Sequence, residues 1–91
     1  MATLLKILPD GKYEFMEGGA RSESIKFNGD GTHKIVGHTP IVGCCMLVGS
    51  VTARSYSDRD FWITTEVLEI LENTDDVVKF KTKNSIYEWR G

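Results

Sequence analysis

The chain has 91 residues, 41% of them hydrophobic and 10% aromatic, which allows one small core and excludes a second domain. Eleven Lys and Arg residues against thirteen Asp and Glu residues give a formal net charge of −2, so no overall positive field attracts the protein to nucleic acid. The charged fraction of 26%, with nine Gly and two Pro, excludes a low-complexity or disordered chain.

Two stretches, residues 1–10 and 39–53, are candidates for targeting or membrane segments. The first is interrupted by Lys6 and ended by Pro9, so it lacks the apolar centre of a signal peptide. The second is uncharged but shorter than the roughly 20 residues that a membrane-spanning helix needs. We therefore expect a cytoplasmic protein that has no membrane partner.

The N-terminal half predicts two β-hairpins. Pro9, Asp10 and Gly11 separate the apolar run 3–8 from the alternating run 12–16, and they are residue types that favour a tight turn. The Asn-Gly-Asp-Gly sequence at 28–31 separates residues 24–27 from 32–36 in the same way. Residues 18–22, which include two glycines, are expected to form a loop between the two hairpins.

The middle of the chain predicts a loop around Pro40 and then a strand. The run 44–54 is apolar and β-branched, and Gly49 within it marks a bulge or a sharp bend. Cys44 and Cys45 are adjacent, so a disulfide between them would be strained, and Cys-X-X-Cys spacing is absent. We expect two reduced thiols in a cytosolic protein.

Residues 61–72 are the one segment in which helix and strand compete. Ile63, Val67, Ile70 and Leu71 recur at helical spacing. However, no capping box opens the segment, it contains two consecutive threonines, and the alternating run 78–83 follows a short turn. We therefore predict a strand hairpin.

The predicted register of this last hairpin comes from its apolar pattern. Pairing Ile70 with Val78 and Leu68 with Phe80 places apolar side chains on one face. The same register sets Glu69 opposite Lys79 on the other face. A kink at residues 84–85 then precedes a final short strand, residues 86–89.

These elements predict an all-β fold, a small antiparallel barrel or compact sandwich of about seven short strands. The alternative is an α+β fold with one helix around residues 61–72. A domain of this size buries little surface, so pairing of an exposed edge strand into a homo-oligomer is expected.

The segment 54–62 is the predicted ligand-binding site because it alternates guanidinium groups with aromatic rings. Arg54 and Arg59 would meet negative charge, since planar guanidinium groups bind phosphate or carboxylate. Tyr56 and Trp62 would stack on a ring. Asn84 and Tyr87 would add polar contacts.

The same segment also has a purely structural interpretation. It would then be a polar loop between two strands, with Tyr56 and Trp62 anchoring its ends in the core. Arg59 would pair with Asp58 or Asp60.

Three other patterns have simpler explanations than a functional site. Lys79, Lys81 and Lys83 would share one strand face, where glutamates of the preceding strand neutralise much of their charge. The set His33, His38, Cys44 and Cys45 is a poor zinc site because adjacent cysteines chelate one ion awkwardly. Residues 28–32 lack the carboxylates of a calcium loop.

No motif for catalysis is present in the sequence. It contains neither a Gly-X-Ser-X-Gly elbow nor a phosphate-binding Gly-Lys-Ser/Thr loop, and neither cysteine has a histidine beside it. We therefore expect a non-enzymatic protein with no catalytic residues, cofactor or metal.

The C-terminal half resembles small uncharacterised bacteriophage and mobile-element proteins. The segments that carry the resemblance are residues 40–43 (Pro-Ile-Val-Gly), 51–57 (Val-Thr-Ala-Arg-Ser-Tyr-Ser), 62–65 (Trp-Ile-Thr-Thr) and 80–89 (Phe-Lys-Thr-Lys-Asn-Ser-Ile-Tyr-Glu-Trp). The resemblance implies a phage-encoded protein in the host cytoplasm. Small phage proteins often act by binding, including as inhibitors of bacterial defence systems.

The leading functional hypothesis is a binding module that sequesters an anionic nucleotide-like ligand or blocks a host defence protein. A single-stranded nucleic-acid-binding protein that uses the lysine stripe is the second hypothesis. A structural, self-assembling virion protein is the third.

Overall fold

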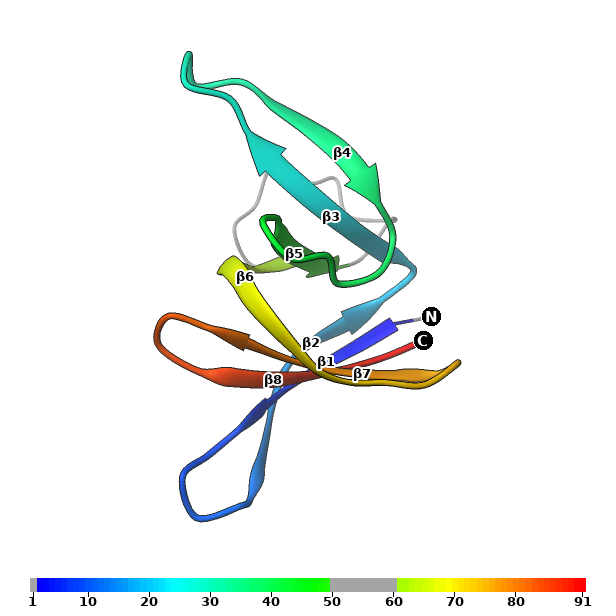
Figure 1. The fold of residues 1–91 in the computed structure, drawn as a ribbon. Helices are drawn as coiled ribbons and strands as arrows, with labels where there is room; N and C mark the ends of the chain where they lie inside the picture. The colour runs from blue at the N-terminus through cyan, green and yellow to red at the C-terminus, as the bar shows by residue number, and fades with distance from the viewer. Residues whose placement is uncertain (1, 50–60) are drawn as a thin grey trace.

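The computed structural model describes residues 2–49 and 61–91, which contain eight antiparallel strands and no helix (Figure 1). The strands are β1 (Ala2–Ile7), β2 (Tyr13–Gly19), β3 (Arg21–Phe27), β4 (His33–Gly37), β5 (Cys45–Gly49), β6 (Phe61–Asn73), β7 (Val77–Thr82) and β8 (Ile86–Arg90). The expected all-β class is confirmed. The alternative helix around residues 61–72 is wrong, because these residues lie in β6. Within the described ranges no helix is long and apolar enough to cross a membrane.

All eight strands belong to one hydrogen-bonded sheet with the order β2-β1-β8-β7-β6-β5-β3-β4. The 13-residue β6 changes partner along its length: residues 61–66 pair with β5 and residues 67–73 with β7. The sheet therefore folds over at β6 into two layers. The lower layer in Figure 1 holds β2, β1, β8 and β7, and the upper layer holds β5, β3 and β4. The eight described strands do not close into a ring through hydrogen bonds, but at a coarse level the sheet has the expected form of a small barrel or sandwich.

The chain also crosses between the two layers at Ala20, where β2 runs almost directly into β3. The expected loop at residues 18–22 is therefore wrong. A Cβ atom at Gly18 would lie 3.4 Å from both the backbone oxygen of Ala2 and the ring of Phe15. Gly18 and Gly19 therefore continue β2 and do not reverse the chain.

Both edge strands of the sheet carry a β-bulge. In β2 the extra residue is Met16, because Leu4 and Leu5 of β1 pair with residues 17 and 15. In β4 the extra residue is Val36, between the partners of Ser24 and Ile25. A bulge twists an edge away from a regular ladder, so both features oppose edge-to-edge pairing of two copies.

The two predicted turns in the N-terminal half are confirmed. Both contain a glycine with positive φ and an aspartate that accepts a backbone hydrogen bond. Gly11 has φ 86° and Gly31 has φ 89°, the left-handed region that glycine adopts without strain. The carboxylate of Asp10 accepts a bond from the amide of Lys12 at 2.9 Å, and Asp30 accepts one from the amide of Thr32 at 3.0 Å. In each turn an aspartate therefore fixes the backbone two residues further on.

The register between β6 and β7 differs from the predicted one because β6 contains bulges. Ile70 pairs with Phe80 and not with Val78. Leu68, expected opposite Phe80, is an extra residue of β6, because residues 67 and 69 on either side of it pair with adjacent residues of β7. Leu68 is 51% exposed. Glu69 therefore faces Lys81, and Glu72 takes the place opposite Lys79.

The core lies between the two layers. Its buried residues are Ala2, Leu4, Met46, Val48, Val67, Val78, Phe80, Tyr87 and Trp89. Phe80 and Tyr87 stack with their ring centroids 5.5 Å apart. Trp89 connects the layers, because its Nε1 donates a 3.0 Å hydrogen bond to the hydroxyl of Ser22. Since strand side chains alternate, the residues between these positions face outward.

Candidate functional site

Of the six residues predicted to bind a ligand, the structure describes three, and these lie in different environments. Arg54, Tyr56 and Arg59 lie outside the described residues. Trp62 is the second residue of β6 and is 40% exposed, whereas Tyr87 is buried in the core against Phe80. Asn84 is exposed in the turn between β7 and β8.

A different group of residues lines a hollow on the outer face of the upper layer. We call this hollow the aromatic groove; its lining residues are Arg21, Ile25, Phe27, His33, Leu47, Phe61 and Ile63. The groove has a volume of about 320 Å³ and draws on β3, β4, β5 and β6. Sites for small ligands begin at about this volume and are mostly apolar with a few polar groups.

Strand alternation explains why these residues meet. On β5, Leu47 faces the groove, whereas Met46 and Val48 on either side face the core. Leu47 pairs with Ile63 on one side and with residue 23 on the other, so the same outer face continues across three strands. Leu47 and Ile25 are 4% and 3% exposed and form the floor of the groove.

One end of the groove is formed by a guanidinium group in a fixed position. The Nε atom of Arg21 forms an ion pair with the carboxylate of Glu23, which is itself buried. The guanidinium carbon lies 6.0 Å from the centroid of the Phe61 ring. Gly49 pairs with both Arg21 and Phe61 and has no side chain to separate them. The terminal nitrogens of Arg21 form no hydrogen bond with another described residue.

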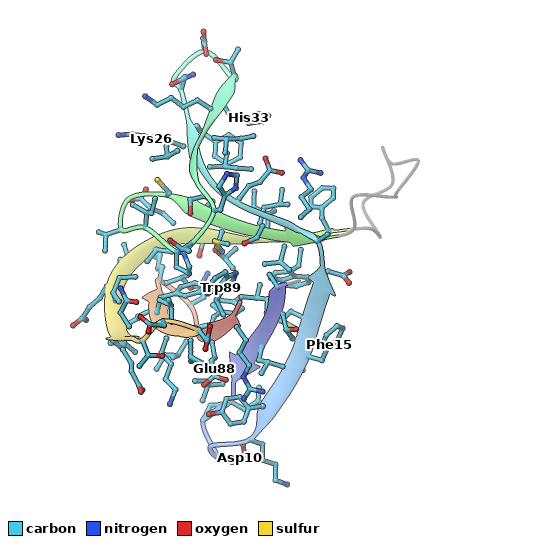
Figure 2. All side chains as sticks on the ribbon, turned by 90° about the vertical axis from the view of Figure 1, so that its right-hand side faces the viewer. Asp10, Phe15, Lys26, His33, Glu88 and Trp89 are labelled. Atoms are coloured by element: carbon cyan, nitrogen blue, oxygen red, sulfur yellow. The ribbon has the colours of Figure 1, made fainter. Side chains whose placement is uncertain are left out.

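The other end of the groove lies on the projecting β3–β4 hairpin. The rings of Phe27 and His33 are tilted against each other with centroids 5.9 Å apart, and Phe27 is 54% exposed. His33 and Lys26 lie on opposite sides of the hairpin in Figure 2. An exposed ring at this position offers a stacking surface next to the apolar floor.

The Cys45 thiol lies on the same face, since Cys45 pairs with Ile25. Burial, the nearby Glu66 carboxylate and Cys44 raise the pKa of Cys45 above its ordinary value. A thiol needs a lowered pKa to act as a nucleophile. The raised pKa therefore leaves less of the Cys45 thiol in the reactive thiolate form.

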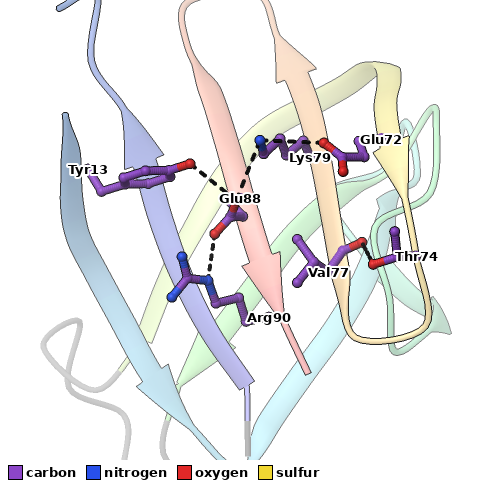
Figure 3. Close-up of polar contacts among 7 residues, drawn as sticks. All are labelled: Tyr13, Glu72, Thr74, Val77, Lys79, Glu88 and Arg90. Carbon is purple, nitrogen blue, oxygen red and sulfur yellow. Dashed lines mark hydrogen bonds and ion pairs between the residues drawn. The ribbon is translucent and has the colours of Figure 1, made fainter. Parts of the chain in front are cut away.

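The outer face of the lower layer carries an ion-pair network around Glu88 (Figure 3). Glu88 is 4% exposed, and its carboxylate contacts Nε of Arg90 at 2.5 Å, the hydroxyl of Tyr13 at 3.4 Å and Nζ of Lys79 at 3.9 Å. Lys79 also pairs with Glu72 at 3.4 Å, and this contact raises the pKa of the lysine. The predicted neutralisation by glutamate is therefore seen at Lys79, and Lys81 lies opposite Glu69 in the register. The predicted stripe does not extend to Lys83, because β7 ends at Thr82.

The histidines and cysteines considered as zinc ligands are not brought together. His38 instead donates from Nδ1 to the backbone oxygen of Ser22 at 3.0 Å. Residues 2–49 and 61–91 contain no group of three or more His, Cys, Asp and Glu side chains positioned to hold a metal ion.

Sequence reasoning missed Arg21, Phe27, His33 and Phe61 as site residues. The available signal was the alternation in residues 21–27, which places Arg21, Ile25 and Phe27 on one strand face. Phe61 comes from a strand that begins 34 residues after Phe27, and only the sheet order β6-β5-β3 brings the two close.

Comparisons with protein-family models, with curated proteins and with solved structures found no match to this chain.

Proposed function

We propose that the protein is a non-enzymatic binding module that holds an anionic nucleotide-like ligand in the aromatic groove. The observation that supports this best is the placement of Arg21 between Glu23 and Phe61 at the end of an apolar groove. A nucleotide has a flat ring and a phosphate, and the groove offers rings with an apolar floor beside a guanidinium. In this proposal the ring stacks on Phe27 or Phe61 and the phosphate binds the terminal nitrogens of Arg21.

The fixed position of Arg21 favours binding because less freedom is lost when the ligand arrives. Glu23 uses Nε of the guanidinium and leaves the terminal nitrogens for the phosphate. Stacking of one base on an aromatic ring contributes about 1–3 kcal/mol. The guanidinium of Arg21 and the aromatic rings border one hollow, so a ligand that contacts both is bound more tightly than a ring or a phosphate alone.

Calorimetric titration with adenosine 5′-monophosphate and with adenosine tests this proposal. We expect the monophosphate to bind more tightly than the uncharged nucleoside. Arg21→Lys keeps the charge but loses the planar fork, and it should weaken monophosphate binding about tenfold. Phe27→Ala should weaken binding of both compounds.

Arg90→Lys is the matched control, because Arg90 also pairs with a glutamate through Nε and lies 5.8 Å from an aromatic ring centroid. It does not line the aromatic groove. Equal affinities of the wild-type protein for monophosphate and nucleoside, or equal losses in Arg21→Lys and Arg90→Lys, would exclude the proposed site.

A second candidate function, single-stranded nucleic-acid binding, is favoured by Lys26 and Lys34. These lysines are directly opposite each other in the β3–β4 register, and neither forms an ion pair with a described residue. Like charges in this position are unfavourable unless an anion binds between them. Titration of a labelled deoxythymidine oligonucleotide at two salt concentrations separates the candidates, because phosphate contacts along a strand give a steep salt dependence.

A further inference from the structure

A second hollow lies at the opposite end of the molecule from the β3–β4 hairpin. It opens between the β1–β2 turn at the bottom of Figure 1 and the β7–β8 turn at its left. Its volume is about 610 Å³, and its lining residues are Lys6, Ile7, Leu8, Pro9, Gly11, Asn84, Ser85 and Ile86. We call it the turn hollow.

The polar side chains of the turn hollow are free to bind a ligand. The ammonium of Lys6, the amide of Asn84 and the hydroxyl of Ser85 form no hydrogen bond or ion pair with other described residues. Glu14 is the cross-strand neighbour of Lys6, but the two charged groups form no ion pair. Three residues with polar side chains, one of them cationic, therefore line the same hollow.

The walls of the turn hollow are apolar. Ile7 and Ile86 pair across β1 and β8, and Leu8 and Pro9 continue the wall into the turn. The turn itself is held by backbone bonds, from the amide of Leu8 to the oxygen of Lys12 at 2.8 Å and from the amide of Gly11 to the oxygen of Leu8 at 2.9 Å. The hollow is therefore built by an ordered turn against a strand pair.

We propose that the turn hollow binds a small carboxylic acid with an apolar body. The carboxylate pairs with the ammonium of Lys6 and accepts hydrogen bonds from Asn84 and Ser85, and the apolar body lies against Ile7 and Ile86. This is the usual composition of a small-molecule site, in which apolar walls supply most of the contact and a few polar groups fix the orientation. The site shares no residue with the aromatic groove and is independent of the function proposed there.

Titration of ¹⁵N-labelled protein with octanoate, followed by amide chemical shifts, tests this proposal. We expect the amide shifts to change in residues 6–8, 10–11 and 84–86. Lys6→Met keeps the length of the side chain and removes its charge, and it should weaken octanoate binding about tenfold. The uncharged analogue 1-octanol should bind the wild-type protein and Lys6→Met equally.

Lys83→Met is the matched control, since Lys83 lies in the same β7–β8 turn but does not line the hollow. Its affinity for octanoate should equal that of the wild-type protein. Glu14→Gln removes the neighbouring negative charge and should raise the affinity. The proposal is wrong if octanoate shifts no amide in these segments, or if Lys6→Met and Lys83→Met behave alike while the spectra show that both are folded.

Discussion

Arg21 of β3 and Phe61 of β6 meet across β5, with the guanidinium carbon 6.0 Å from the ring centroid. Arg90 and Tyr13 repeat this arrangement on the other layer at 5.8 Å, and each arginine also pairs with a glutamate two residues away on its own strand. Only the first arrangement borders a described hollow. Arg90 is therefore an internal control for Arg21, because it has the same kinds of contact but does not border either hollow.

The buried carboxylate of Glu88 should contribute measurably to stability. Glu88→Gln removes the charge that holds Arg90, Lys79 and the Tyr13 hydroxyl, and it should lower the free energy of unfolding by about 1–3 kcal/mol in urea denaturation. Glu69→Gln, at an exposed position of β6, should change it by less than about 0.5 kcal/mol. Equal effects of the two substitutions would show that the network around Glu88 has no net stabilising role.

Two glycines of one turn should respond differently to alanine. Gly31 has φ 89°, so Gly31→Ala forces a side chain into the left-handed region and should cost about 1–2 kcal/mol of unfolding free energy. Gly29 does not have a positive φ, and a Cβ atom at this position would have no heavy atom within 4 Å. Gly29→Ala should therefore lower the unfolding free energy much less. Thermal or urea unfolding measures both, and the opposite order would contradict the described turn.

The reactivity of Cys45 should depend on Glu66. Burial and, after it, the Glu66 carboxylate raise the pKa of Cys45, so Glu66→Gln should lower that pKa in part and increase the thiolate fraction at pH 8. Alkylation by iodoacetamide, followed by mass spectrometry of the native protein, should be faster in the variant, while Cys44, which is 5% exposed, stays protected in both. Equal rates at Cys45 in the two proteins would contradict this electrostatic assignment.

The cost of truncating Leu68 distinguishes the observed bulge from the register expected from sequence. Leu68 is 51% exposed, so Leu68→Ala should cost less than about 1 kcal/mol of unfolding free energy. Leu4→Ala removes the same atoms from a fully buried position and should cost about 2–5 kcal/mol. A large cost at Leu68 would support the register that places it opposite Phe80.

Local chemistry in the sequence correctly predicted the all-β class and the two turns at residues 9–11 and 28–31. Asp10 with Gly11 and Asp30 with Gly31 act within a few residues, so their pattern can be read directly. The register of β6 could not be read in this way, because the bulge residues Leu68 and Leu71 interrupt the alternation, and both are apolar but exposed. An apolar pattern alone cannot distinguish such residues from core residues.

The candidate site was missed for a related reason. The sequence directs attention to contiguous segments such as residues 54–62, whereas the aromatic groove combines Arg21, His33 and Phe61 from three strands. Their proximity depends on the sheet order, in which β5 and β3 are neighbours although β4 lies between them in the chain. Long-range pairing of this kind leaves no local signal.

Mapping of adenosine 5′-monophosphate onto the ¹⁵N-labelled protein by amide chemical shifts tests the central claim most directly. The proposed function predicts concentration-dependent shifts at the strand positions that line the groove, in residues 21–27, 33, 47 and 61–63. It also predicts that Arg21→Lys reduces these shifts at equal ligand concentration. Shifts confined to the lower layer around Glu88, or no shifts at millimolar ligand, would contradict the claim.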